Sequence, residues 1–141
     1  MTFMTEDEFQ KIIALWLNAA LPEKSLWHHS PNEGKRHVAY AKRLIDLGMK
    51  PGFPDIEIFV HKDFWWSGIA SPIFIEVKAP GRGRLSDKQK IVQEQLLELG
   101  CAVATVNRLG QLKHFLSNHI ELRANGATDL QEKIASSLGA L

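Results

Sequence analysis

The chain has 141 residues, a length typical of one domain with a single hydrophobic core. Hydrophobic residues make up 45% and charged residues 23% of the sequence, close to the globular average, which excludes a disordered or fibrous chain. The formal net charge of +1 excludes a polycation that binds nucleic acid through bulk charge, but it allows local charged patches of either sign.

Neither a membrane span nor a secretory signal is expected. No uncharged apolar run approaches the roughly 18 residues that a span requires, and the acidic start MTFMTEDEFQ lacks an apolar signal core. Cys101, the single cysteine, lies in the apolar run CAVATV, as is typical of proteins from the reducing cytosol. We therefore expect a cytoplasmic protein without membrane contact.

The first half of the chain predicts two helices and three strands. Apolar residues at helical spacing predict a helix that Thr5 caps and Pro22 ends. Residues 25–30 predict a short strand, and 35–47 a second amphipathic helix that Gly48 ends. Two strand-like runs follow, DIEIFV and PIFIEVKA, joined by a long hairpin tip.

The second half predicts a helix, a strand and another helix. Ser86 and Gln89 form a capping-box signature at the start of a helix that Gly100 ends. CAVATVN reads as a buried strand, residues 109–119 as a helix, and the tail from Asn125 as weakly helical at best. This order predicts an α/β fold with helices on both faces of the sheet and a crossover between two parallel strands.

Two acids and a lysine mark the two central strands. Glu76 and Lys78 share one face of their strand, because residues i and i+2 point the same way. Antiparallel pairing brings Asp55 close to both. Such a cluster in apolar strands is costly unless something compensates, and a hard divalent cation held by carboxylates would do so. Taken alone, the same pattern also fits a surface salt bridge on an edge strand.

Longer strings around these residues carry a family resemblance. Pro54-Asp55 followed by EVK resembles the PD-(D/E)XK nuclease signature. The strings HHSPNEGKR, GMKPGFPD, FIEVKAPGRGRLSDKQ and LELGCAVATV resemble the VRR-NUC family, the virus-type replication-repair nuclease domain, over residues 5–118. The resemblance implies one nuclease domain over 1–141 with a C-terminal tail at 119–141. It also implies a PD-(D/E)XK restriction-endonuclease-like fold, with a mixed central sheet of about four strands flanked by helices.

The resemblance also implies a metal site and a catalytic lysine. Asp55 and Glu76 match the metal-binding acids, joined by the backbone carbonyl of Val77, and the expected cofactor is Mg²⁺ or Mn²⁺. Lys78 matches the family lysine, which would orient or help to deprotonate a metal-bound water.

Two further side chains match the family pattern less specifically. Gln89 matches a glutamine that faces the site, although the capping box alone would explain it. Glu6 best matches the acid of the first helix, because Gln10 follows at the family's spacing, but Asp7 and Glu8 lie beside it. The ordinary interpretation of Glu6 is a first-turn acid that complements the helix dipole.

Basic residues and two tryptophans complete the candidates. A DNA-binding role is expected for Lys35, Arg36, Arg82, Arg84 and Lys88, with a solvated surface as the alternative. Trp65 and Trp66 at the hairpin tip either bind a partner or unstacked bases, or fold back over the sheet.

The implied function is that of a stand-alone phage or bacterial endonuclease acting on branched DNA, as a Holliday-junction resolvase-like homodimer. One alternative keeps the site but acts as a monomeric flap or nicking nuclease. The other is a non-catalytic DNA-binding module in which the acids and the lysine form a structural ion-pair network.

Overall fold

The computed structural model describes residues 4–30, 38–81 and 83–141. Its elements are α1 (Glu6–Ala20), β1 (Ser25–His29), α2 (Val38–Asp46), β2 (Ile56–Val60), the 3-10 helix η1 (Lys62–Phe64), β3 (Ile73–Val77), α3 (Asp87–Glu98), β4 (Ala102–Val106), α4 (Leu109–His119) and α5 (Gly126–Ser137). None of the helices within these ranges is long and apolar enough to cross a membrane.

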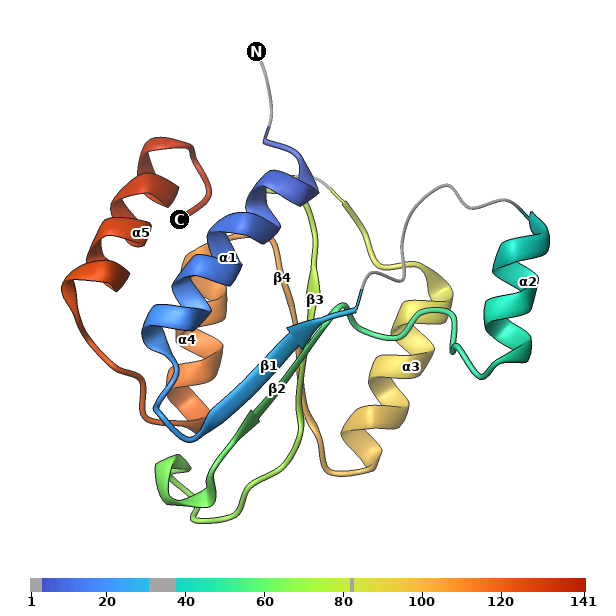
Figure 1. Ribbon diagram of the computed structural model, residues 1–141, viewed down its shortest axis with the longest axis horizontal. Helices are drawn as coiled ribbons and strands as arrows, with labels where there is room; N and C mark the ends of the chain where they lie inside the picture. Colours follow the sequence, from blue (N-terminus) through green and yellow to red (C-terminus); the bar gives the residue numbers. More distant parts are fainter. Residues whose placement is uncertain (1–3, 31–37, 82) are drawn as a thin grey trace.

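The four strands form one mixed sheet in the order β1-β2-β3-β4, which confirms the predicted fold class. β1 and β3 both pair antiparallel with β2, and β3 pairs parallel with β4 through the connecting helix α3. The predicted crossover is therefore present (Figure 1). Because β3 has a partner on each side, the interpretation of its acid and lysine as an edge-strand salt bridge is wrong.

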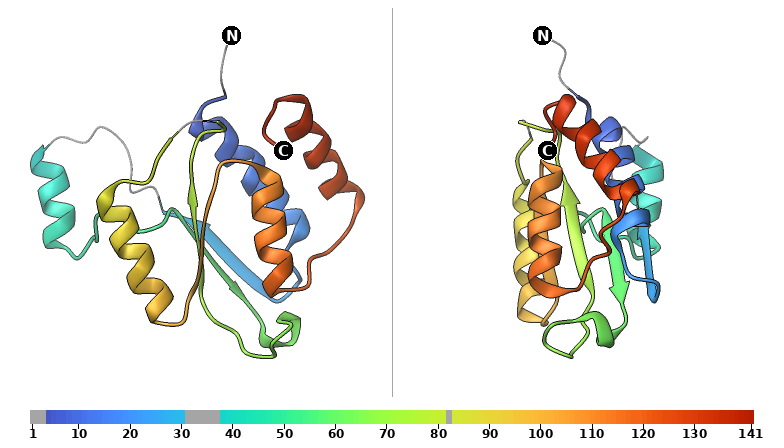
Figure 2. Two further views of the ribbon diagram at one scale, coloured as in Figure 1. Left: turned by 180° about the vertical axis from the view of Figure 1, so that it is seen from behind. Right: turned by 90° about the vertical axis from the view of Figure 1, so that its left-hand side faces the viewer.

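The two faces of the sheet have different surroundings. Side chains alternate along a strand, so Ile73, Ile75 and Val77 of β3 enter the main core together with residues of α1 and α4. On the other face Phe74 lies in a smaller apolar cluster with Val92 of α3. Figures 1 and 2 show the same division, with α1, α4 and α5 on one side of the sheet and α3 and α2 on the other.

The C-terminal segment is a well-formed helix, so the prediction of a weakly helical tail is wrong. Asn125 caps α5 by accepting hydrogen bonds from the backbone N–H groups of Ala127 and Thr128. Helix α5 lies against α1, and Ala135 and Ala140 are fully buried in the main core. Its buried residues are few and small, so the sequence shows no strong apolar stripe, and stability comes from the cap and from tertiary contact.

Helix α2 also differs from its prediction. Residues 35–37 of the expected helix lie outside the described ranges, and the helix is seen from Val38. The helix ends at Asp46, one residue before the predicted end at Leu47, and no residue of α2 is buried.

The two tryptophans at the hairpin tip differ in burial. Trp65 is buried, and its indole N–H donates to the Val60 carbonyl, 3.0 Å away. The Trp66 side chain is 64% exposed, and its indole N–H donates to the Ser117 carbonyl at 2.8 Å. The interpretation that the tryptophans fold back is correct for Trp65. Trp66 stays at the surface, where its hydrogen bond to the Ser117 carbonyl holds the indole ring in place.

Candidate active site

The two predicted metal-binding acids are neighbours across the sheet. Ile56 of β2 is paired with Ile75 of β3, so the next pair in this antiparallel register is Asp55 and Glu76. Both are buried, with 3% and 1% of their surface exposed. The Asp55 carboxylate accepts a hydrogen bond from the backbone N–H of Val77 at 3.1 Å, which anchors it to β3. The structure thus brings together two carboxylates that are 21 residues apart in the chain.

Glu76 has two polar neighbours on the α3 side of the sheet. The Gln89 side-chain amide donates to Glu76 Oε1 at 2.7 Å, and Lys78 Nζ lies 3.5 Å from the same oxygen. The Lys78 side chain is only 11% exposed. Its stem lies against Gly83, where a Cβ atom would come within 3.1 Å of the Lys78 Cβ. The ammonium group is therefore held beside the buried carboxylate.

One side chain, Gln89, performs both of the tasks that the sequence left as alternatives. Its Oε1 accepts from the Ser86 N–H at 2.8 Å. The backbone N–H of Gln89 donates to Ser86 Oγ, which completes the capping box of α3. Its Nε2 remains available to donate to Glu76. The start of α3 is thereby joined to the acid pair through a single amide.

A glycine allows the segment before Asp55 to approach α3. Gly52 has a φ of +85°, and a Cβ atom there would lie 2.7 Å from the backbone carbon of Lys88. Only glycine fits such a contact without a backbone shift. Gly52 therefore sets the distance between the segment that delivers Asp55 and the helix that delivers Gln89.

Two polar residues next to the acid pair were not identified from the sequence. Thr105 of β4 is paired with Glu76, and the Gln93 side chain donates to Thr105 Oγ1 at 2.9 Å. The available signal was the spacing of Gln93, which lies four residues after Gln89 and so on the same helix face. Asp55, Glu76 and Thr105 thus form a polar row across three strands.

The first-helix acids have separate surroundings. Glu8 belongs to the capping box of α1, where its carboxylate accepts from the Thr5 N–H at 2.8 Å, and Asp7 is exposed. Glu6 is half-buried in the same turn. Among the described residues no group of three or more His, Cys, Asp or Glu side chains could hold a metal ion. The catalytic role of Glu6 therefore stays a prediction.

The predicted DNA-binding residues are placed only in part. Arg84 precedes α3 and Lys88 lies in its first turn, and both are exposed. Lys35, Arg36 and Arg82 lie outside the described residues. Arg84 lies on the connection from β3 to α3 and Lys88 at the start of that helix, so both follow Glu76 closely in the chain.

The donor set fits a hard divalent cation. Magnesium prefers oxygen ligands and is commonly held by one or two carboxylates, with waters and substrate phosphate completing its shell. Asp55 and Glu76 supply two buried carboxylates next to each other in the sheet register. An all-oxygen donor set of this kind is one that Mg²⁺ and Mn²⁺ prefer.

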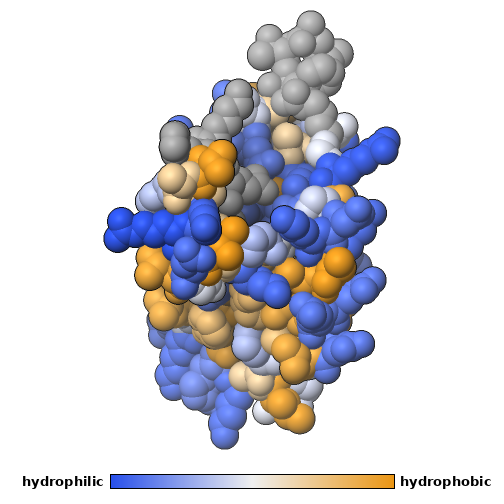
Figure 3. All heavy atoms as spheres, turned by 90° about the vertical axis from the view of Figure 1, so that its right-hand side faces the viewer, coloured by the Kyte–Doolittle hydropathy of each residue, from blue (hydrophilic) through white to orange (hydrophobic). Residues whose placement is uncertain are grey.

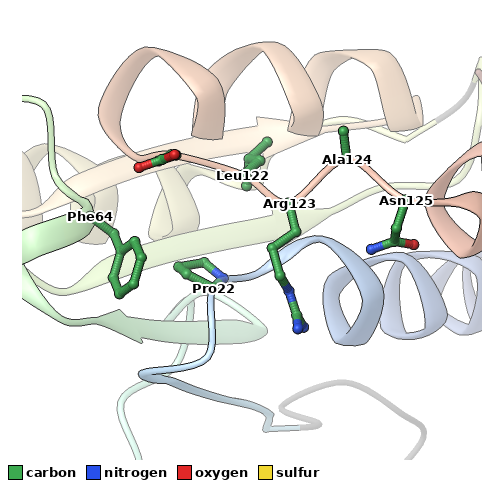
Figure 4. A pocket seen from close by; sticks show the side chains of 7 residues that line it. Pro22, Phe64, Leu122, Arg123, Ala124 and Asn125 are labelled. Atoms are coloured by element: carbon green, nitrogen blue, oxygen red, sulfur yellow. The ribbon is translucent and has the colours of Figure 1, made fainter.

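A cavity of about 510 Å³ lies elsewhere in the molecule (Figure 4). It is lined by Pro22, Phe64 and the segment 121–125, whose Arg123 N–H donates to the Ala20 carbonyl at 2.8 Å. None of the predicted site residues lines it.

Comparison with known proteins finds a matching family and a similar solved structure. The VRR-NUC domain family matches residues 5–108. A solved structure described as a "VRR_NUC domain protein" superposes with a TM-score of 0.61 at 22% sequence identity, covering 83% of this chain and 92% of that chain. This similarity supports the fold. No curated protein matches the sequence. With most of its length matched, the chain belongs to the VRR-NUC domain family.

Proposed function

We propose that this protein is a metal-dependent, structure-selective endodeoxyribonuclease that hydrolyses phosphodiester bonds in branched DNA. Membership of the VRR-NUC family implies a nuclease-type function. The observation that supports the finer proposal is the buried Asp55–Glu76 pair with Lys78 Nζ 3.5 Å from Glu76. An acid pair joined to an ammonium group and an amide on one sheet face is an arrangement that can hold a cation next to a scissile phosphate.

Each residue of the site would have a separate role in hydrolysis. Asp55, Glu76 and the Val77 carbonyl would hold Mg²⁺ or Mn²⁺, which when bound supplies a water of lowered pKa and positive charge for the phosphate. Lys78 would orient that water and offset the negative charge that develops on the phosphate oxygens. Gln89 fixes the orientation of Glu76 through its 2.7 Å hydrogen bond, as residues behind metal ligands commonly do.

The proposed substrate is a four-way junction, cleaved by a homodimer. Two copies related by a two-fold axis would present two acid pairs to two strands of the junction. Arg84 and Lys88, together with Lys35, Arg36 and Arg82, would contact backbone phosphates near the site, independently of sequence.

Cleavage by wild type and Glu76→Gln tests the proposal. Glutamine keeps the size of the side chain and an oxygen that can accept from Gln89, so the fold is expected to survive. We expect wild type to cut a labelled four-way junction with Mg²⁺ or Mn²⁺ and not with EDTA, and Glu76→Gln to retain less than a few per cent of that rate.

Other outcomes would support the alternatives. Cleavage of flaps in preference to junctions by a protein that light scattering shows to be monomeric would favour the flap nuclease. No calorimetric binding of millimolar Mg²⁺ or Mn²⁺ and no cleavage would favour the non-catalytic module.

A further inference from the structure

We propose that helix α2 and its exit, residues 38–50, form an arm that contacts branched DNA, with cations for the backbone and apolar side chains for unpaired bases. We call this segment the α2 arm. The inference rests on the proposed function, because it names an element that would bind the substrate of the acid pair.

The α2 arm belongs to the connection between β1 and β2, and this connection begins and ends beside the candidate site. The Ser30 N–H donates to the Asp55 carbonyl at 2.7 Å, so the points where the chain departs and returns are in contact. Gly52, just after the arm, lies against the backbone of Lys88 in α3. Figures 1 and 2 show α2 outside α3, away from the sheet and on the same side as the face that carries the acid pair.

The arm presents apolar side chains to solvent. Val38 is 82% exposed, Leu47 73% and Ile45 47%, and no residue of the helix is buried. A nine-residue helix has little stability of its own in water, since isolated helices shorter than about 12 residues are marginal. Figure 3 views this side of the molecule and shows apolar residues at the surface between hydrophilic ones. A short amphipathic helix whose apolar side chains no other element covers leaves a place where a partner can pack.

The charge distribution identifies the partner as a polyanion. Residues 35–50 and 78–90 together contain ten Lys and Arg residues and two acids, a net charge of +8 in a chain whose total is +1. The rest of the chain therefore carries −7. The arm itself contributes Lys42, Arg43 and Lys50 against Asp46. The positive charge is thus concentrated in residues 35–50, of which the arm is the larger part, and in residues 78–90, which contain Lys78 and the start of α3.

Apolar and cationic groups together favour DNA with accessible bases. A continuous duplex offers phosphates to the cations but keeps its bases stacked. At a branch point bases can unstack and contact aliphatic side chains, while the adjoining phosphates contact Lys and Arg. The arm is therefore expected to strengthen binding to branched DNA more than binding to linear duplex.

Equilibrium binding of two double variants tests both parts of the inference. Fluorescence anisotropy without divalent metal would measure a labelled four-way junction, a flap and a linear duplex of equal length. We expect Val38→Ser with Leu47→Ser to weaken junction and flap binding about 5- to 20-fold and duplex binding less than 2-fold. We expect Lys42→Gln with Arg43→Gln to weaken all three similarly and to lower the log–log salt slope by about one to two.

Matched controls lie on other helices. Leu130→Ser with Leu138→Ser removes two leucines that are each 55% exposed, on or just after α5, and Lys11→Gln with Lys133→Gln removes two distant exposed cations. Both controls are expected to bind like wild type. Circular dichroism would check folding. Every variant is expected to keep the helical content of wild type, except for any loss within α2 itself.

Several results would overturn the inference: arm variants that bind like their controls, equal weakening of branched and linear DNA by the serine variant, or no binding of branched DNA by wild type. Dissociation of a dimer by the serine variant with unchanged DNA affinity would assign the surface to a second copy instead. Wild type that binds junctions through the arm but never cleaves them would refute the proposed hydrolysis and support the arm. Metal-dependent cleavage with binding unaffected by the arm variants would do the opposite.

Discussion

Replacing Gln89 with methionine removes the amide that joins α3 to the acid pair while keeping the length of the side chain. The variant loses the 2.7 Å hydrogen bond to Glu76 and the 2.8 Å bond to the Ser86 N–H. A hydrogen bond to a charged group contributes about 1.5–3 kcal/mol, and loss of part of a helix cap costs about 0.5 kcal/mol. We expect the free energy of unfolding without metal to fall by about 2–3 kcal/mol.

The variant should also bind metal more weakly. Residues that orient a metal ligand typically change affinity by about 10- to 100-fold when they are replaced. We therefore expect Gln89→Met to bind Mn²⁺ at least about tenfold more weakly than wild type in calorimetry. Gln89→Glu should keep the capping box but place a third carboxylate at the acid pair. Its stability without metal should be low, and Mg²⁺ should restore more of it than in wild type.

Urea unfolding in EDTA, followed by tryptophan fluorescence, measures the stability change. Gln93→Met is the matched control, because Gln93 lies one turn later on α3 and donates to Thr105 instead of to a carboxylate. Its expected cost is under about 1 kcal/mol. If Gln89→Met were no less stable than Gln93→Met and bound Mn²⁺ like wild type, the assigned link between α3 and Glu76 would be refuted.

Three further predictions concern other parts of the site. Lys78→Met should leave Mn²⁺ binding intact while single-turnover cleavage falls by orders of magnitude; equal loss of both would make Lys78 a structural support. Gly52→Ala should lower the free energy of unfolding by about 2–5 kcal/mol, whereas Gly48→Ala, also at positive φ but with open space around it, should cost about 1–2 kcal/mol. Denaturation curves of the two glycine variants check the difference. Arg84→Gln with Lys88→Gln should lower the salt slope of DNA binding by about one to two, with a smaller effect on cleavage at saturating DNA; an unchanged slope would mean a solvated loop.

Much of the sheet and of its acid pair follows from local rules. The two-residue period of a strand places Glu76 and Lys78 on one face, and the antiparallel pairing of β2 and β3 brings Asp55 to the same end. The Ser86–Gln89 spacing predicts the start of α3, which the capping box confirms. These features depend on neighbours in sequence or on a single strand pairing, so the sequence alone determines them.

Other features depend on how the elements meet in space. Trp65 and Trp66 are adjacent and chemically identical, yet Trp65 enters the core and Trp66 stays exposed. The difference depends on how the 3-10 turn before them and helix α4 pack together. The apolar positions of α2 indicate an amphipathic helix, but the helix lies outside α3, where the described residues bury none of its side chains. Periodicity shows that a helix has an apolar face and not whether another element covers it.

The contact between Gln89 and Glu76 shows the same division at the site. The capping signature locates the glutamine at the third helical position, but its reach to the carboxylate depends on how closely α3 approaches the sheet. That approach is set by Gly52, 37 residues earlier in the chain, whose missing Cβ lets the two backbones touch. The sequence by itself determined which groups line one face of β3, and only tertiary packing decided which of them meet, since contact distances depend on the whole fold.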